Sequence, residues 1–260
     1  MNRKYLLVDL SNFIFRFATS KKSAESIAED VFNNISSFRD SLACTDVIIF
    51  VDKKGSDYRK NLYPEYKGNR KKEGKFYEDL KQFFKKLPTI IKFLNIYFPV
   101  LSYTGIEADD LIWYVSQKYK CVILSTDADL LQCGVPQFSY TKKKYITLED
   151  QWADTPRQFI TAKALAGDNS DNIKGLERVG LKTALKYLKK YDVDNFQDLA
   201  DSINPKTKSK IEQRILNGKE IYERNIRLVD LELVNEEIVT PELEREIEEI
   251  INEYKDEESN

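Results

Sequence analysis

Three short apolar segments, far apart in the chain, each lead into an aspartate. They are Leu6-Leu7-Val8-Asp9, Val47-Ile48-Ile49-Phe50-Val51-Asp52 and Val122-Ile123-Leu124-Ser125-Thr126-Asp127. Short runs rich in Val, Ile and Leu are typical of strands that are buried on both faces of a parallel sheet. In open α/β sheets, the functional crevice lies at the carboxyl ends of such strands. The sequence therefore predicts that three carboxylates from distant segments meet at one edge of a sheet.

Four further acids should join this cluster, namely Glu107, Asp109, Asp110 and Asp129. Two carboxylates about 4 Å apart repel each other by roughly 4 kcal/mol at an effective dielectric constant of about 20, so such a cluster needs bound cations. The chain has no histidine, and its three cysteines lack CxxC spacing. The cations should therefore be hard ions that prefer oxygen ligands, Mg²⁺ or Mn²⁺. The absence of histidine also excludes a histidine general base or a histidine-activated nucleophile.

Helix capping is the alternative explanation for the individual acids. Glu107 and Asp110 stand at positions i and i+3 of an expected helix start, where acidic residues often serve only as caps. Likewise, Asp127-Ala128-Asp129 fits an ordinary turn between a strand and a helix. Capping does not explain why three strands end in aspartate while a fourth acidic motif begins a helix. We therefore favour metal binding.

Segments with strand and helix patterns alternate from residue 1 to about residue 150. This order predicts an α/β fold with a mostly parallel, twisted sheet and helices on both faces. The chain after about residue 150 should be all-helical and should end in an acidic helix. We favour packing of this helix against the rest of the protein, with a partner-binding segment as the alternative. The expected strands cover residues 5–8, 47–51, 97–101 and 122–124, with a hairpin at 138–146, and the expected helices cover residues 23–42, 77–94, 111–120, 156–166 and 181–191.

The formal net charge of −2 hides an uneven distribution of charge. Residues 230–260 carry thirteen acidic and two basic side chains, which leaves 39 bases and 30 acids in the rest of the chain. Residues 53–92 alone contain thirteen bases and five acids, interleaved with tyrosines such as Tyr58 and Tyr66. Cationic and aromatic side chains in this mixture are typical of single-strand nucleic-acid binding. The alternative is a solvated, lysine-rich loop.

A second candidate for nucleic-acid binding is the glycine-rich stretch from Gly167 to Gly180. Residues 174–190, which overlap it, carry six bases and one acid. Backbone N–H groups at the start of a following helix, with Lys182 and Thr183 beside them, can bind a phosphate without reading sequence. The alternative is an ordinary glycine-capped turn between helices.

Five motifs occur here in the order found in the 5′-nuclease (flap endonuclease) family. The chain most resembles the free-standing bacteriophage 5′–3′ exonucleases, and it is also similar to the 5′-nuclease domain of bacterial DNA polymerase I. The resemblance covers about residues 4–230 and leaves the acidic tail outside it. The motifs are Val8-Asp9, Leu62-Tyr63-Pro64-Glu65-Tyr66-Lys67-Gly68-Asn69-Arg70, Gly105-Ile106-Glu107-Ala108-Asp109-Asp110, Ser125-Thr126-Asp127-Ala128-Asp129 and Gly167-Asp168-Asn169-Ser170-Asp171-Asn172-Ile173.

The resemblance implies a fold and a set of site residues. The fold is a PIN-like α/β domain over residues 1–150 with a helical arch at about 53–95. A helical DNA-binding region follows over 151–260, with a helix–three-turn–helix element at about 157–191. Two or more Mg²⁺ or Mn²⁺ ions would be held by Asp9, Asp52, Glu107, Asp109, Asp127, Asp129 and Asp171, with Asp110 and Asp168 in support. Lys67 and Arg70 would meet the scissile phosphate, Tyr66 would stack on a base, Arg16 would contact a phosphate, and Gly175, Gly180, Lys182 and Thr183 would anchor the duplex.

The resemblance also implies a function. We expect a structure-specific, metal-dependent 5′ nuclease that cuts phosphodiesters near single-strand/duplex junctions, leaves 5′-phosphates and removes RNA primers or flaps in phage replication. Its partners would be branched or 5′-ended DNA and RNA–DNA duplexes. We further expect a monomer in a reducing cytoplasm, without a membrane span. Two alternatives stay open, a PIN-type ribonuclease acting on single-stranded RNA and a non-catalytic junction-binding protein with structural Mg²⁺.

Overall fold

A six-stranded sheet forms the centre of the computed structural model, which describes residues 3–69 and 73–257. The strand order is β3-β2-β1-β4-β5-β6, with all neighbours parallel except the antiparallel pair β5 and β6. The expected mostly parallel sheet and its terminal hairpin are therefore confirmed. The strands are β1 (Tyr5–Asp9), β2 (Asp46–Phe50), β3 (Val100–Leu101), β4 (Cys121–Leu124), β5 (Gln137–Ser139) and β6 (Lys144–Ile146).

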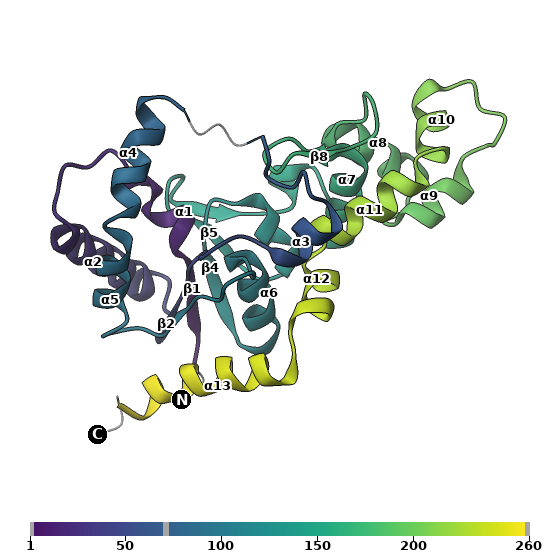
Figure 1. Cartoon of the computed structure of the whole chain (residues 1–260). Helices are drawn as coiled ribbons and strands as arrows, with labels where there is room; N and C mark the ends of the chain where they lie inside the picture. The colour runs from purple at the N-terminus through teal and green to yellow at the C-terminus, as the bar shows by residue number, and fades with distance from the viewer. Residues whose placement is uncertain (1–2, 70–72, 258–260) are drawn as a thin grey trace.

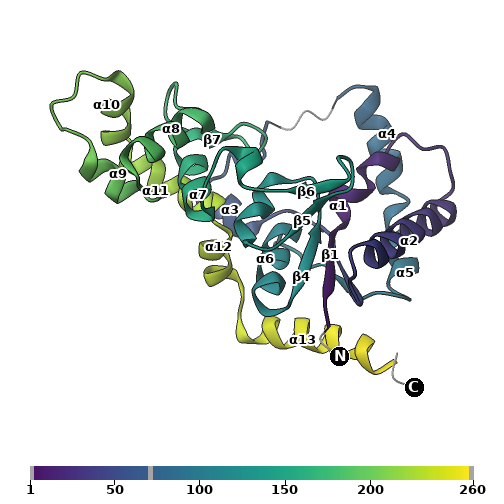
Figure 2. The same cartoon turned by 180° about the vertical axis from the view of Figure 1, so that it is seen from behind.

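Successive residues of the central strands enter two separate cores, because side chains alternate across a sheet. Leu6 and Val8 of β1 pack with α1 (Leu10–Ile14), α2 (Ala24–Ser41) and α5 (Leu87–Leu94) on one face. Tyr5 and Leu7 pack with α6 (Ala108–Lys118) on the other face. Figures 1 and 2 show the helices on both sides of the sheet. The continuous apolar runs in the sequence reflect this burial on both faces.

The described residues between β2 and β3 form α3 (Asp57–Leu62), α4 (Lys75–Phe84) and α5. A single helix over residues 77–94 is wrong, since α4 ends at Phe84 and α5 begins at Leu87. The reason is Pro88, which lies in the first turn of α5. A proline in a helix interior lacks the N–H for the intrahelical hydrogen bond and clashes with the preceding turn.

Most of the remaining chain forms helices around a third core. Both α7 (Pro156–Ala166) and α8 (Leu181–Tyr191) have the predicted bounds. One correction is a short antiparallel pair between them, β7 (Gly167–Asp168) and β8 (Ile173–Lys174). Glycine is required beside this pair, since a Cβ on Gly175 would lie 2.0 Å from the carbonyl carbon of Ala166. The later helices are α9 (Phe196–Ser202), α10 (Lys210–Leu216), α11 (Lys219–Val229) and α12 (Leu231–Ile238).

The acidic helix α13 (Pro241–Glu257) returns to the α/β part of the molecule. Ile247 and Ile251 are each 1% exposed and join the core that contains Tyr5 and Leu7. Both views place α13 beside the amino end of β1, away from α4 and the β7–β8 turn (Figures 1 and 2). The expected packing role of this helix is therefore confirmed. No helix in the described part of the chain is long and apolar enough to cross a membrane.

Candidate metal centre and nucleic-acid interface

Three aspartates reach one edge of the sheet because each stands at or just after the carboxyl end of a strand. Asp9 is the last residue of β1 and accepts hydrogen bonds from the Asn12 N–H at 3.0 Å and from the Ser125 hydroxyl at 2.9 Å. Asp127 follows β4 and caps the short 3₁₀ helix Ala128–Cys133. Asp52 follows β2 and accepts from the N–H of Ala108, the first residue of α6, at 2.9 Å.

These three aspartates and Asp109 of α6 repel one another. We call Asp9, Asp52, Asp109 and Asp127 the first carboxylate group. In the described part of the chain, none of the four forms an ion pair with a lysine or arginine within 4 Å. Burial raises the pKa of Asp9 to about 7, with repulsion from Asp52 and Asp127 adding to the effect. Burial and the charges of Asp127 and Asp9 hold the pKa of Asp109 well above its usual range. Burial and neighbouring Asp129 raise the pKa of Asp127 to about 6.

The remaining acids already have cationic or hydroxyl partners. Glu107 accepts from Lys67 Nζ at 2.6 Å, the Tyr66 hydroxyl at 2.8 Å and Arg59 Nη1 at 3.3 Å. Although burial opposes its ionisation, Lys67 and Arg59 hold the pKa of Glu107 below its usual value. Asp171 lies close to the same donors, 3.1 Å from the Tyr66 hydroxyl and 3.7 Å from Lys67 Nζ.

Lys163 of α7 supplies the cation for two further acids. Its Nζ contacts Asp129 and lies 3.0 Å from Asp168. Burial works against ionisation of Asp168, but Lys163 and the Ser170 donors outweigh it and lower the pKa of this carboxyl to about 2. We call Glu107, Asp129, Asp168 and Asp171 the second carboxylate group.

A cavity of about 30 Å³ lies beside the second group. Its lining includes Asp109 of the first group, all four acids of the second group and Lys163. It is large enough for a water molecule or a small ion. As the described side chains stand, no three acids are arranged around one ion position. The all-oxygen donor set nevertheless fits Mg²⁺ or Mn²⁺, because these ions prefer carboxylate ligands.

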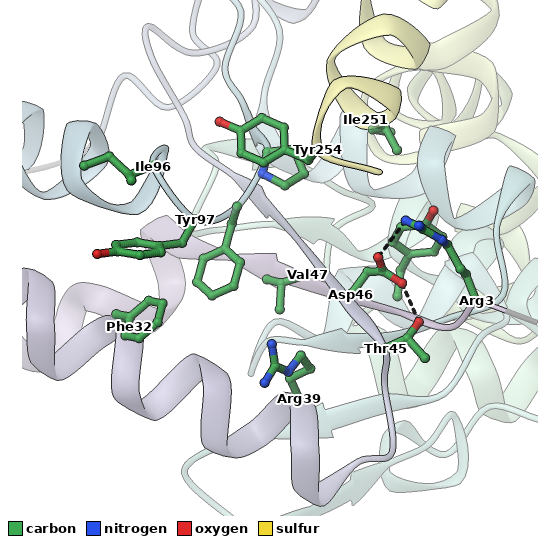
Figure 3. Close-up of a pocket in the computed structure, with 13 residues that line it drawn as sticks. Arg3, Phe32, Arg39, Thr45, Asp46, Val47, Ile96, Tyr97, Ile251 and Tyr254 are labelled. Atoms are coloured by element: carbon green, nitrogen blue, oxygen red, sulfur yellow. Dashed lines mark hydrogen bonds and ion pairs between the residues drawn. The ribbon is translucent and has the colours of Figure 1, made fainter. Parts of the chain in front are cut away.

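A larger cavity, of about 310 Å³, lies away from this chemistry at the amino end of the sheet. Figure 3 shows Phe32, Arg39 and Asp46 around it, with Tyr254 of α13 on its rim. None of the predicted site residues that the structure describes lines this cavity. Its size therefore does not identify it as the functional site.

Two predicted site residues are buried and paired within the protein. Asp110 is fully buried and receives hydrogen bonds from both Arg59 Nη atoms, at 2.7 and 2.8 Å, so it braces the fold rather than facing an ion. Tyr66 is 4% exposed, and its hydroxyl donates to Glu107 and Asp171, so its ring is covered in this structure. The prediction for Arg70 lies outside the described residues.

The expected nucleic-acid contacts lie on the surface around the acids. Arg16 is exposed, and its guanidinium lies 4.1 Å from the ring centroid of Phe13. Exposed Gly180 precedes α8, and apart from its two chain neighbours no described residue comes within 4 Å of a Cβ added there. The nearby Lys182 Nζ lies 3.8 Å from the ring centroid of Trp152. Thr183 is half-buried in the same first turn of α8. Gly175 packs closely against the backbone of Ala166.

Sequence reasoning missed three residues at this site, Arg59, Lys163 and Trp152. Lys163 left a signal, because it is the one charged residue between Phe159 and Leu165, and a buried lysine requires an acidic partner. Trp152 is half exposed, which is uncommon for so large an apolar side chain. Arg59 left no signal, since it stands in a segment rich in exposed bases.

Comparison with protein families agrees with this arrangement. The family described as 5′–3′ exonuclease, N-terminal resolvase-like domain matches residues 4–158, and 5′–3′ exonuclease, C-terminal SAM fold matches residues 154–251. The flap endonuclease of Escherichia phage T5 is 33% identical over 246 residues, which cover 88% of this chain and 84% of that protein. DNA polymerase I of Lactococcus lactis is 29% identical over 206 residues, which cover 72% of this chain and 22% of the polymerase.

Comparison with solved structures also points to flap endonucleases. A crystal structure of the bacteriophage T5 flap endonuclease, in a complex with DNA and metal ions, has a TM-score of 0.83 at 29% identity and covers 97% of this chain. All of that structure's chain is matched. The sheet, its acidic edge and these matches together define a nuclease. The chain belongs to the 5′–3′ exonuclease family, and the resemblance seen in its motifs is confirmed.

Proposed function

We propose that this nuclease is a structure-specific 5′ nuclease that uses two or more Mg²⁺ or Mn²⁺ ions. It would hydrolyse phosphodiesters near single-strand/duplex junctions and leave 5′-phosphates. The observation that supports this most strongly is the first carboxylate group, in which burial and the charges of neighbouring carboxylates raise the pKa of Asp9 and Asp127. Cations of high charge are the direct way to relieve this repulsion at neutral pH.

The two carboxylate groups would hold separate ions. The first group, Asp9, Asp52, Asp109 and Asp127, would hold one, and members of the second group would hold the other. When bound, such ions lower the pKa of a water molecule and stabilise the transition state of in-line phosphoryl displacement. With no histidine in the chain, no side-chain imidazole competes for the role of base.

The side chains around the acids would bind and orient the substrate. Lys67 Nζ lies at the carboxylates with its side chain 22% exposed, so it can contact a phosphate brought to the ions. We assign Arg70 the same task on the basis of the family motif. Arg16 would hold a neighbouring phosphate. Backbone N–H groups after Gly180 would hold the duplex together with Lys182.

The substrates would be branched or 5′-ended DNA and RNA–DNA duplexes, bound by a monomer. Phage DNA replication, where RNA primers and flaps must be removed, is the setting we infer from the similarity to the T5 enzyme. All three cysteines are unpaired and buried, which suits the reducing cytoplasm of a host cell.

The direct test is cleavage of a duplex with a 5′ flap, labelled at the flap end and at the downstream 3′ end. We expect release of the flap, with a 5′-phosphate on the new end, in Mg²⁺ or Mn²⁺ and binding without cleavage in Ca²⁺. Mononucleotide release would shift the balance towards exonuclease action. Cleavage confined to single-stranded RNA would favour the ribonuclease alternative, and tight flap binding without any cleavage would favour the junction-binding alternative.

The Asp109→Asn variant tests the site within this assay. It removes one charge from the first carboxylate group, so we expect cleavage to fall by at least about 10²-fold while flap binding in Ca²⁺ is largely preserved. Asp201→Asn, on the exposed surface of α9, is the matched control and should cut normally. Normal single-turnover rates for Asp109→Asn would remove this residue from the metal centre.

A further inference from the structure

Lys163 is a buried lysine on a helix that is otherwise apolar around it. Its side chain is 11% exposed, and its neighbours Ala162, Ala164 and Leu165 are completely buried. Its ammonium contacts Asp129 of the 3₁₀ helix Ala128–Cys133 and Asp168 of β7. One lysine of α7 therefore joins two carboxylates that come from separate elements.

The ammonium of Lys163 lies beside the small cavity lined by the acids of the second group. Asp129, Asp168 and Lys163 all line this cavity of about 30 Å³. The first group has no comparable internal cation among the described residues, because the ion pairs of Lys67, Lys163 and Arg59 go to Glu107, Asp110, Asp129, Asp168 and Asp171. The two halves of the metal centre thus differ in charge balance before any ion binds.

We propose that Lys163 is a built-in counter-ion that competes with a divalent cation for Asp129 and Asp168 and thereby sets the affinity of the second ion. This inference rests on the proposed metal-dependent function and assigns Lys163 a positioning role. A divalent ion entering the second group must take carboxylate oxygens from the ammonium. The displaced ammonium is compact and strongly hydrated, so leaving it unpaired beside an apolar helix is costly. The first group requires no such displacement and should bind its ion more tightly.

Competition of this kind also has a benefit for the metal-free protein. Without Lys163, Asp129 and Asp168 would add two uncompensated charges to an edge that already has four repelling carboxylates. The ammonium should therefore keep the protein folded when ions are scarce. Removing it should make stability depend more strongly on the ion.

The test is calorimetric titration of the metal-stripped full chain with Ca²⁺ and with Mn²⁺, in the absence of DNA. Lys163→Met removes the charge and keeps the side-chain length, and Lys163→Gln keeps a hydrogen-bond donor. Lys189→Met is the matched control, because Lys189 pairs with Asp154 on the exposed surface at 2.7 Å. We expect the dissociation constant of the weaker ion to fall by about tenfold or more in both Lys163 variants, which corresponds to about 1.4 kcal/mol. The tighter ion should be little changed.

A second readout is the melting temperature in EDTA, which should fall in both Lys163 variants and recover with Ca²⁺. If Lys163→Met does not fold without ions, the titration of Lys163→Gln decides the question. The inference is overturned if the affinity for the more weakly bound ion is unchanged or lower in the Lys163 variants. It is also overturned if Lys189→Met gains as much affinity as they do. Wild-type protein that binds no divalent ion overturns the proposed function as well, whereas two-ion binding with unchanged affinity in the variants overturns the inference alone.

Discussion

Arg59 is the residue that most constrains the interior of the site. It is 3% exposed, and its guanidinium donates to Asp110, Glu107 and the Leu228 carbonyl, which joins α3 to α6 and α11. We expect Arg59→Met to lower the free energy of unfolding by about 3–5 kcal/mol, because it leaves the buried Asp110 carboxylate without a counter-charge. Urea denaturation measures the loss.

The control for this prediction is Arg59→Met combined with Asp110→Leu, which removes both charges. It should recover a large part of the lost stability, since replacing a buried ion pair by apolar side chains is often neutral. A loss below about 1 kcal/mol in the single variant would mean that the pair contributes no more than a surface ion pair.

Two adjacent acids show which features of single residues could not be predicted from the sequence. Asp109 and Asp110 belong to one motif, yet Asp109 faces the other carboxylates while Asp110 is bound by Arg59. A helix turns by about 100° per residue, so the motif predicts that the two side chains diverge. The motif does not predict which of the two carboxylates will meet Arg59. Tyr66 is a similar case, because its burial depends on Glu107 and Asp171, which come from distant segments.

At the scale of elements, the proposed duplex anchor consists of α8 and the turn before it. The Trp152 ring, 3.8 Å from Lys182 Nζ, holds this ammonium near the start of the helix. We expect Lys182→Ala to weaken binding to duplex-bearing substrates and to lower the slope of log K against log salt by about one phosphate contact, roughly 0.9. Fluorescence anisotropy over a series of salt concentrations measures both quantities.

Lys189→Ala is the control on the same helix, because Lys189 is already paired with Asp154. Its salt slope should stay close to that of the wild type. Equal slopes for Lys182→Ala and the wild type would show that Lys182 makes no phosphate contact. Trp152→Phe should keep most of the affinity, because a phenyl ring also attracts a cation.

Elements with strong local signals were predictable from the sequence, and those without them were not. Helix α7 has Thr155 as its N-cap and Pro156 in its first turn, so its start was clear. The β7–β8 pair has two residues in each strand and no apolar run, so no periodicity could indicate it. It exists because Gly167 and Gly175 let two backbone segments approach closely, which is a tertiary effect.

At the scale of the whole molecule, the two edges of the sheet have opposite roles. The carboxyl edge carries the two carboxylate groups of the proposed metal centre, with the basic segments around it, while α13 places its acids at the amino edge (Figures 1 and 2). This separation keeps the acidic helix away from the surface that a polyanion would approach. The net charge of −2 therefore understates the attraction of the site for nucleic acid.

The carboxylates at the carboxyl edge of the sheet predict how the stability of the protein depends on pH when metal ions are removed. The folded pKa of Asp9 is about 7 and that of Asp127 about 6, against an ordinary value of 3.8 for each. Between about pH 4 and pH 7 the folded state therefore binds more protons than the unfolded state, so stability falls as the pH rises through this window. A shift of about three units at Asp9 corresponds to at most roughly 4 kcal/mol.

We expect Asp9→Asn to stabilise the protein in EDTA at pH 8, by up to roughly 4 kcal/mol, and to have little effect at pH 4, where Asp9 is protonated in the folded wild type. Asparagine also keeps the cap on α1. With saturating Ca²⁺ at pH 8 the order should reverse, because the wild type gains more from the ion than a variant that lacks one of its ligands. Thermal unfolding at both pH values, with Asp201→Asn as the control, measures these differences. A stabilisation by Asp9→Asn that is equal at pH 4 and pH 8 would contradict the role of charge repulsion at the acidic edge.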